Sequence, residues 1–331
     1  MKSKKLCLGI LAIMLVFGML VIGCDEPDNE PKDDRPMGPK WTMVSNLPFG
    51  TGSIHDIAYG DGKFIVVGFS SSANSRIAYS TDGINWSLVN NLSPYIYPKA
   101  IAYGGGKWVT DDSYSTDGLN WVAATGTLNL DANYPEIVYG GGKFVAVGGN
   151  NKIAYSTNGQ TWEMVSNPPF GTDSINAIAY GDGKFVAVGG KKIANSTDGI
   201  NWTAVSPALF DSTISCIAYG GGKFVASDGR NTAYSLDGIS WTPIIQNKLE
   251  GDWYSINYLH FSTLAFGNNK WIGLDVFGGF MSFMGYSSDG INWTPAFNPP
   301  DISLPRAIYG NGKFVVVSSS AVNGHIAYSA Q

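Results

Sequence analysis

The sequence has few of the residues that cross-link chains or bind metals. Among its 331 residues are three cysteines and three histidines. Cys7 and Cys24 lie in the first 24 residues, so Cys216 stands alone in the remainder and cannot form an intramolecular disulfide there. The histidines show no ligand spacing, which predicts no transition-metal site. They are His55, His260 and His325.

Positive charge is also scarce. Charged residues make up 14% of the chain, and its net charge is −5. Only three arginines follow residue 40, namely Arg76, Arg230 and Arg306. A nucleic-acid surface needs a dense positive field, so nucleic acid is not an expected partner. The recurring Gly-Gly-Gly-Lys segments lack the Ser or Thr of a phosphate loop, so no cofactor is expected.

A six-residue motif, Tyr-Gly-x-Gly-Lys-Phe, occurs in seven near-copies. The copies begin at Tyr59, Tyr103, Tyr139, Tyr180, Tyr219, Phe266 and Tyr309. Most copies are followed by Tyr-Ser-Thr-Asp-Gly-x-Asn-Trp, which ends at Trp86, Trp121, Trp162, Trp202, Trp241 and Trp293. A period of about 40 residues with strand signals in each copy predicts a radial array of small sheets.

One repeat predicts four antiparallel strands. In the first copy, short apolar runs cover residues 57–59, 64–67, 77–80 and 86–89. The first two runs flank Asp61-Gly62, and the last two flank Asp82-Gly83. An Asp-Gly pair between two such runs is typical of a tight hairpin turn, because both residues tolerate positive φ. Each repeat therefore has the strand content of one propeller blade.

The two ends of the array predict how it closes. The last repeat stops after its third strand, at residues 325–329, while an unpaired Trp strand at residues 40–44 precedes the first repeat. The N-terminal strand would complete the final blade and remove the open sheet edges. The expected fold is an all-β, seven-bladed β-propeller of four-stranded antiparallel blades, closed by the N-terminal strand and monomeric.

The Ser-Thr-Asp-Gly-x-Asn-Trp motif resembles the Asp-box, or bacterial neuraminidase repeat, of sialidase-like propellers, over residues 41–331. The match departs from the family pattern because Asp and Gly are adjacent, and Asn158 and Leu236 replace repeated residues. In that family the motif is a fold element away from the active site, so the resemblance implies a scaffold and no particular chemistry. The three arginines lack the family's context, and sialidase activity is not expected.

The start of the chain predicts a membrane anchor. Three lysines precede an apolar run over residues 6–22, and Gly23-Cys24 follows it. This pattern resembles a bacterial lipoprotein signal peptide over residues 1–23, with Cys24 as the lipidated residue. Residues 24–40 then form the lipidated cysteine and an acidic, proline-rich tether, and residues 41–331 form the propeller. The expected location is extracytoplasmic, on the periplasmic face or the cell surface.

The copies also show where a binding surface is expected. The two tight turns recur, whereas the other two loops of each blade vary and lie together on the opposite rim. Blade six varies most, with aromatic residues suited to a protein or glycan partner, although these loops also suit packing against themselves. The candidates there are Trp253, Tyr254, Tyr258, Phe277, Phe280 and Phe283.

A second set of varying residues begins the inner strands and is expected to surround the mouth of the central channel. It consists of His55, Asp56, Lys99, Glu136 and Arg306. The leading hypothesis is a lipid-anchored binding module for an envelope or extracellular protein or glycan. One alternative is a glycosidase with paired carboxylates, for which Asp56, Glu136, Asp111 and Asp112 are present without a clear pair. The other is an envelope-assembly scaffold.

Overall fold

The structure is a computed structural model of the chain. It describes residues 39–50, 52–69, 75–90, 92–93, 96–125, 128–130, 135–205, 209–245, 261–277, 281–296, 302, 305–318 and 325–329. Over those residues it contains only strands and their connections, with no helix. No helix long and apolar enough to cross a membrane occurs in that part of the chain.

Seven four-stranded antiparallel sheets make up the described residues, one for each predicted blade. Blade one is β2 (Ser53–Gly60), β3 (Lys63–Phe69), β4 (Ser75–Ser80) and β5 (Ser87–Leu88). Blade two is β6 (Ile101–Gly104), β7 (Lys107–Thr110), β8 (Ser113–Ser115) and β9 (Val122–Ala123). Blade three is β10 (Glu136–Gly140), β11 (Lys143–Gly148), β12 (Lys152–Ser156) and β13 (Glu163–Met164). Blade four is β14 (Ala177–Gly181), β15 (Lys184–Gly189), β16 (Lys192–Ser196) and β17 (Thr203–Val205).

The remaining blades repeat this order. Blade five is β18 (Cys216–Gly220), β19 (Lys223–Ser227), β20 (Thr232–Ser235) and β21 (Thr242–Pro243). Blade six is β22 (Thr263–Gly267), β23 (Lys270–Phe277), β24 (Met281–Ser287) and β25 (Thr294–Ala296). Blade seven is β26 (Pro305–Gly310), β27 (Lys313–Ser318), β28 (Ile326–Ser329) and β1 (Trp41–Met43). The predicted closure by the N-terminal strand is therefore confirmed.

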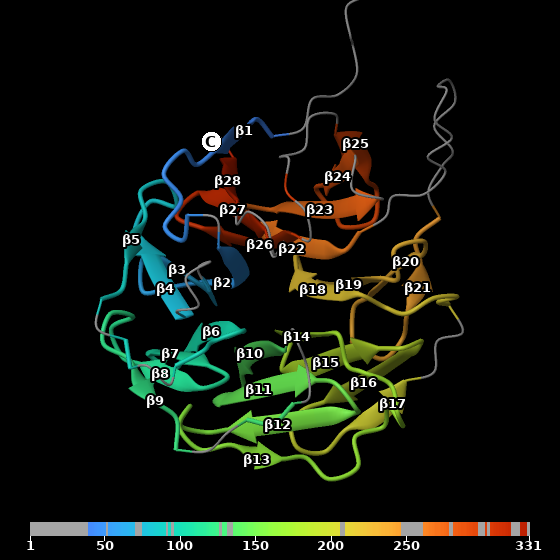
Figure 1. The fold of residues 1–331 in the computed structure, drawn as a ribbon. Coiled ribbons are helices and arrows are strands. Elements are labelled where there is room, and N and C mark those ends of the chain that lie inside the picture. The colour runs from blue at the N-terminus through green and yellow to red at the C-terminus, as the bar shows by residue number, and fades with distance from the viewer. Residues whose placement is uncertain are drawn as a thin grey trace, which may run out of the picture. The chain divides into compact units, whose positions relative to one another are not determined.

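The blades form a ring around a central axis (Figure 1). Each inner strand lies beside the inner strands of the two neighbouring blades, and the series returns from β26 to β2. The apolar residues form seven clusters, each drawn from two neighbouring blades. The core therefore lies between the blades and not within any one of them, so no blade can bury its apolar faces alone.

The repeated Tyr-Gly pair forms the contact between neighbouring blades. A Cβ atom built on Gly60 would lie 2.0 Å from the ring of Tyr103 in the next blade, and one built on Gly104 would lie 2.0 Å from the ring of Tyr139. The same relation recurs at every junction, ending with Gly310 and Tyr59. The sequence repeats Tyr and Gly together because the aromatic ring of one blade occupies the space left by the missing side chain of the previous blade.

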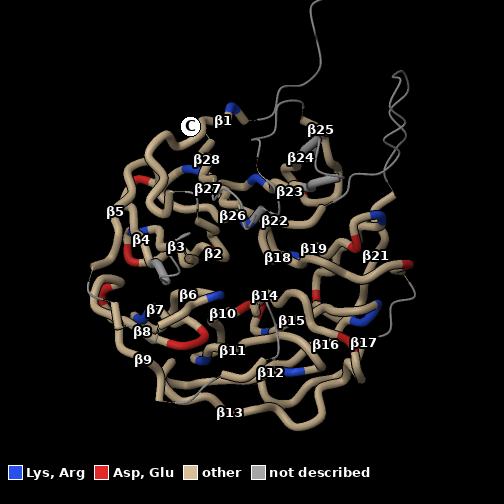
Figure 2. The backbone as a smooth tube through the Cα atoms, in the orientation of Figure 1, with Lys and Arg blue, Asp and Glu red and all other residues tan. Residues whose placement is uncertain are grey.

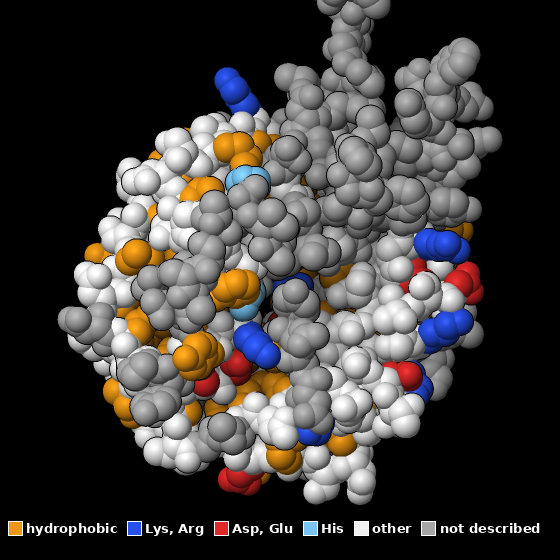
Figure 3. All heavy atoms as spheres, viewed as in Figure 1, with side chains coloured by type: hydrophobic (Ala, Val, Ile, Leu, Met, Phe, Trp, Pro, Cys, Tyr) orange, Lys and Arg blue, Asp and Glu red, His pale blue; other side chains and the backbone are white. Residues whose placement is uncertain are grey.

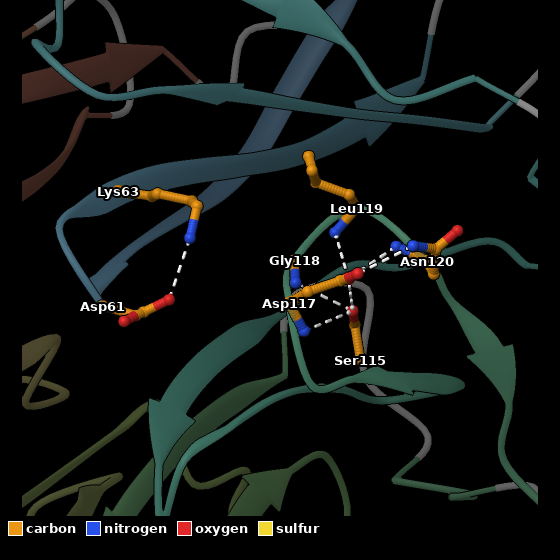
Figure 4. A network of polar contacts seen from close by, with 7 residues as sticks. All are labelled: Asp61, Lys63, Ser115, Asp117, Gly118, Leu119 and Asn120. Carbon is orange, nitrogen blue, oxygen red and sulfur yellow. Dashed lines mark hydrogen bonds and ion pairs between the residues drawn. The ribbon is translucent and has the colours of Figure 1, made fainter.

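The Asp-box-like turn is held by its own side chains (Figure 4). In blade two, Asp117 Oδ1 accepts hydrogen bonds from the backbone N–H groups of Leu119 at 2.8 Å and Asn120 at 2.7 Å. Asp117 Oδ2 accepts another from the Asn120 side chain at 2.7 Å. The Gly118 N–H donates to Ser115 Oγ at 2.9 Å. The hydrogen bond from the Asn120 N–H, together with the other hydrogen bonds to the carboxylate, lowers the pKa of Asp117 below its usual range.

The repeated lysine links neighbouring blades. Lys107 Nζ donates to the Asn158 carbonyl of blade three at 3.0 Å, and Lys313 Nζ donates to the Asp82 carbonyl of blade one at 2.8 Å. In blade one, Lys63 pairs with Asp61 of its own hairpin turn at 2.8 Å (Figure 4). The repeated lysines at positions 107 and 313 therefore help to hold adjacent blades together.

Replacing Asp117 by alanine is expected to lower the free energy of unfolding by about 1 kcal/mol, because two backbone N–H groups lose their acceptor. Asp117→Asn should cost less, since Asn158 already makes the equivalent bonds in blade three. The depressed pKa stabilises the fold above the unfolded pKa near 3.8. The advantage of wild type over Asp117→Asn should therefore disappear as the pH falls below that value. Urea unfolding at neutral and acidic pH measures both effects; equal stability of all three proteins at neutral pH would contradict the assignment.

Candidate functional site

A cavity of about 290 Å³ lies at the axis of the ring. All seven inner strands contribute to its wall, which combines polar groups with apolar side chains such as Ile57 and Leu264. The charged residues in the wall are Asp56, Glu136 and Arg306, from blades one, three and seven. Acidic and basic positions both occur around the axis (Figure 2), and the space-filling view shows both signs of charge beside the opening (Figure 3).

Asp56 is fixed by the backbone of two blades. Its Oδ1 accepts a hydrogen bond from the N–H of Ile57, and its Oδ2 accepts one from the N–H of Ile101 in blade two, both at 2.9 Å. Burial raises the pKa of Asp56 to about 6, although the charge of Arg306 and these two N–H groups act in the opposite direction. Asp56 is therefore a carboxyl group that titrates close to neutral pH.

Glu136 has the same position in blade three. Its Oε2 accepts a hydrogen bond from the N–H of Ile178 in blade four at 3.2 Å. Burial raises the pKa of Glu136 to about 7, the charge of Arg306 lowers it, and the charge of Asp56 raises it further. The two carboxyl groups therefore influence each other across the cavity, although about 80 residues separate them in the sequence.

Arg306 supplies the positive charge of the cavity. Its position in β26 brings the guanidinium close enough to lower the pKa of both carboxyl groups. Among the described residues, no ion pair within 4.0 Å joins it to either of them. The guanidinium and the carboxylates thus face the same cavity without direct contact.

Other residues at the beginning of the inner strands join neighbouring blades. Asn176 Nδ2 donates to the carbonyl of Ile214 in blade five at 2.9 Å, and Ser215 Oγ donates to the carbonyl of Phe261 in blade six at 3.3 Å. These positions vary in residue type from blade to blade, which the sequence reasoning interpreted as freedom for function. Part of that variation is structural, because different side chains perform the same bridging role.

His55 and Lys99 lie outside the cavity wall. His55 occupies a β-bulge between Ile54 and Asp56, and its ring lies 5.4 Å from that of Phe69. Burial lowers the pKa of His55, and the charge of Lys99 lowers it further, which places the two side chains near each other. Of the five residues predicted at the channel mouth, the structure brings Asp56, Glu136 and Arg306 together in the cavity and leaves these two beside it.

Asp111 and Asp112 hold a loop of blade two. Asp111 Oδ1 accepts hydrogen bonds from the N–H groups of Lys99 at 2.7 Å and Ala100 at 3.2 Å. Asp112 accepts one from the N–H of Tyr97. Burial raises the pKa of both carboxyl groups. Neither residue lines the cavity, so they position the loop that enters blade two.

Two further polar residues of the wall, Cys216 and Thr263, were not among the predicted site residues. Both lie three positions before the first residue of the repeated motif, as Asp56, Glu136 and Arg306 do. The residue three positions before the motif therefore marks the cavity wall, whereas the residue four positions before the motif does not. Cys216 is buried; its Sγ–H donates to the Phe261 carbonyl at 3.3 Å, and burial raises its pKa to about 12.

The aromatic set proposed for blade six lies mostly outside the described residues, which include none of Trp253, Tyr254, Tyr258 and Phe280. Phe277 and Phe283 belong to strands β23 and β24. These strands pair as far as Phe277 and Met281. The sequence placed Phe277 and Phe283 in a varying loop of blade six, and this was wrong, because both belong to the hairpin. The aromatic and β-branched residues of that segment favour extension of the hairpin.

The comparisons with known proteins identify the fold. No protein-family model and no curated protein matches the chain. The chain is similar to YCF48 bound to D1 peptide, with 15% identity, a TM-score of 0.64, and coverage of 90% of this chain and 99% of that one. It is also similar to a catalytically inactive virginiamycin B lyase from Staphylococcus aureus with quinupristin, with 13% identity, a TM-score of 0.67, and coverage of 89% and 100%.

A third similar structure is the WD40 β-propeller domain of Doa1, with 13% identity, a TM-score of 0.57, and coverage of 88% of this chain and 97% of that one. At such low identities the likeness concerns the fold alone, and the functions of these proteins do not transfer with it. The chain is a seven-bladed β-propeller.

Proposed function

We propose that this chain is a lipid-anchored, extracytoplasmic propeller that binds a protein segment on the rim where its inner strands begin, hereafter the loop rim. The opposite rim, which carries the two repeated turns of each blade, is the turn rim. The fold supports the proposal, because propellers often mediate protein interactions and a similar structure, YCF48, is bound to a peptide. Lipidation at Cys24 remains a proposal from the sequence motif.

The difference between the two rims is the observation that carries the proposal. On the turn rim, side chains such as Asp117 and Asn158 bind their own backbone in nearly the same way from blade to blade. Because this surface is nearly the same in each blade, a partner could bind equally well at several places around the ring. The loop rim differs in every blade, and its loops are therefore the surface on which one partner can be distinguished.

Within the described residues, the loop rim of blades one and two carries two exposed aromatic side chains. Tyr97 is 59% exposed and Phe69 is 39% exposed. Phe69 lies against His55 at the end of β3, and Tyr97 is held by Asp112 in the loop that enters blade two. Aromatic residues on a fixed backbone are typical of interface anchors. This surface is the part of the loop rim that we assign to the partner.

The double variant Phe69→Ala/Tyr97→Ala is expected to capture about tenfold less partner than wild type, as the loss of interface anchors does. The full chain with a C-terminal tag is cross-linked in its host, and the captured proteins are quantified from the membrane fraction. The matched control is Leu236→Ala/Ile239→Ala, which removes two exposed apolar side chains from the turn rim. Equal losses in both double variants, or in neither, would contradict the assignment.

The anchor is tested in the same extract. Cys24→Ser removes the sulfur that would carry the lipid, and it should abolish incorporation of labelled palmitate into the chain. If wild type is not labelled, or the variant is labelled equally, the lipid-anchor part of the proposal is wrong, while partner binding can still be scored.

A glycosidase is the second candidate, because Asp56 and Glu136 share one cavity and burial raises the pKa of both. Such an enzyme uses one carboxyl group as the acid and the other as base or nucleophile. Both groups, however, already accept backbone hydrogen bonds, and the cavity is at the lower limit of ordinary ligand sites. A panel of fluorogenic glycosides tests this candidate.

A further inference from the structure

We propose that the cavity at the ring axis binds a small zwitterion, a molecule of amino-acid size with one carboxylate and one ammonium group. The carboxylate would lie on Arg306, and the ammonium would lie between Glu136 and Asp56. This inference does not rest on the proposed partner, because it concerns the cavity at the axis and not the exposed side chains of the loop rim.

The first argument is the separation of opposite charges in one cavity. Arg306 influences both carboxyl groups electrostatically, yet no ion pair within 4.0 Å joins it to either one. Opposite charges that can reach each other in a protein interior usually pair, because burying an unpaired charge is costly. A ligand with both charges would bridge this gap by presenting a carboxylate to the guanidinium and an ammonium to the carboxylates.

The second argument is the hydrogen-bonding capacity that remains in the cavity. Glu136 uses Oε2 for the N–H of Ile178, and its Oε1 makes no bond to a described residue. The guanidinium of Arg306 likewise donates no hydrogen bond to a described residue. A guanidinium is well suited to a carboxylate because its parallel N–H groups bind both oxygens. The free groups therefore match the two ends of a zwitterion.

The third argument is size. The cavity of about 290 Å³ is at the lower limit of small-molecule sites, so it suits an amino acid better than a sugar chain or a folded partner. Apolar side chains, including Ile137 and Ile308, also line the cavity. They can contact a small apolar substituent on the ligand, while the charged groups hold its two ends.

Binding should be linked to protons. An ammonium group beside the carboxyl groups favours their charged forms, so binding between about pH 6 and pH 7 should release protons. Affinity should fall as the pH drops below 6, where both carboxyl groups are protonated. The other titratable residues of the wall are Cys216, Tyr59, Tyr103 and Tyr139, and His55 and Lys99 lie beside it.

Isothermal titration calorimetry of the full chain in detergent provides the test. The probes are L-alanine and β-alanine as zwitterions, propionate as the carboxylate alone and propylamine as the ammonium alone. Both charges contribute to the proposed site, so at least one zwitterion should bind about tenfold more tightly than either single-charge probe, which corresponds to about 1.4 kcal/mol. Titrations in buffers of different ionisation enthalpy should show proton release for that zwitterion near neutral pH.

Two variants locate the site. Arg306→Gln and Glu136→Gln should each weaken zwitterion binding about tenfold, as expected when one of two charged contacts is lost. Arg230→Gln is the matched control, because Arg230 does not line the cavity. Thermal unfolding checks that each variant is folded, and the wild-type probe series stands even if Glu136→Gln is not. Phe69→Ala/Tyr97→Ala should bind the zwitterion as wild type does, which separates this test from that of the partner.

Three outcomes would overturn the proposal. The first is no binding of either zwitterion up to about 10 mM, a concentration that detects a Kd near 1 mM. The second is equal binding of propylamine, which would make the cavity a simple cation site. The third is unchanged zwitterion affinity in folded Arg306→Gln.

Discussion

A chain that begins at residue 45 should lose much of its stability and should aggregate, because it lacks β1. That strand pairs with β28 from Trp41↔Ser329 to Met43↔Ala327, and the N–H of Val44 donates to the Ile326 carbonyl at 2.8 Å. Val44 is buried in the cluster between blades seven and one. Losing this strand's hydrogen bonds and buried side chains should cost on the order of 5 kcal/mol. It also exposes β28 as an open edge.

The matched comparison is a circular permutant in which residues 39–45 follow residue 331. The end of β28 lies opposite the start of β1, so a short turn can join them. The permutant should recover the thermal stability and the elution volume of wild type, whereas deletion of residues 1–38 alone should change neither. If the chain from residue 45 unfolds at the wild-type temperature and elutes as wild type does, closure by β1 does not stabilise the ring.

Gly181→Ala is expected to lower Tm by about 10 °C. A Cβ atom at this position would lie 2.0 Å from Cγ of Tyr219 in the next blade, so the ring or the backbone would have to shift. Tyr219 is itself packed against Phe224, with 4.7 Å between the ring centroids. Overpacking of this kind costs about 1–3 kcal/mol or more, and each kcal/mol shifts Tm by about 2–4 °C in a domain of this size. Differential scanning calorimetry measures the change.

A double-mutant cycle separates the steric clash from other effects of the added methyl group. Tyr219→Ala alone should be destabilising because it leaves a void between blades four and five. In that background, however, Gly181→Ala should cost almost nothing, since the ring it would strike is gone. Additive losses would show that the Tyr–Gly contact does not explain the repeated pair.

The blade number and the closure could be predicted because the sequence contains seven near-copies of the same blade. Asp61 and Gly62 adopt φ values of 45° and 69°, and equivalent turn residues recur along the chain, so the turns were readable from residue type alone. The role of the repeated Tyr and Gly was not readable in this way. Their contact crosses from one blade to the next, and a strand pattern describes only the blade that contains it.

The site could be predicted only in part. Asp56, Glu136 and Arg306 were recognised as varying residues at the start of inner strands, but their common cavity depends on three blades converging on one axis. His55 and Lys99 were predicted on the same grounds, but they lie one position closer to the N-terminus than the wall residues and outside the wall. The alternation of side chains along a strand separates these positions, but its phase becomes known only from the register of the hairpin.

Since the same ring-on-glycine contact occurs at all seven junctions, every blade presents one surface that fits its successor and another that fits its predecessor. A tandem duplication of about 40 residues would therefore insert a blade whose two sides already match their neighbours. Duplication or deletion of whole blades would change the blade number, and with it the width of the central channel, while every junction keeps the same contact. The Tyr-Gly pair thus allows the blade number of such a propeller to change during evolution.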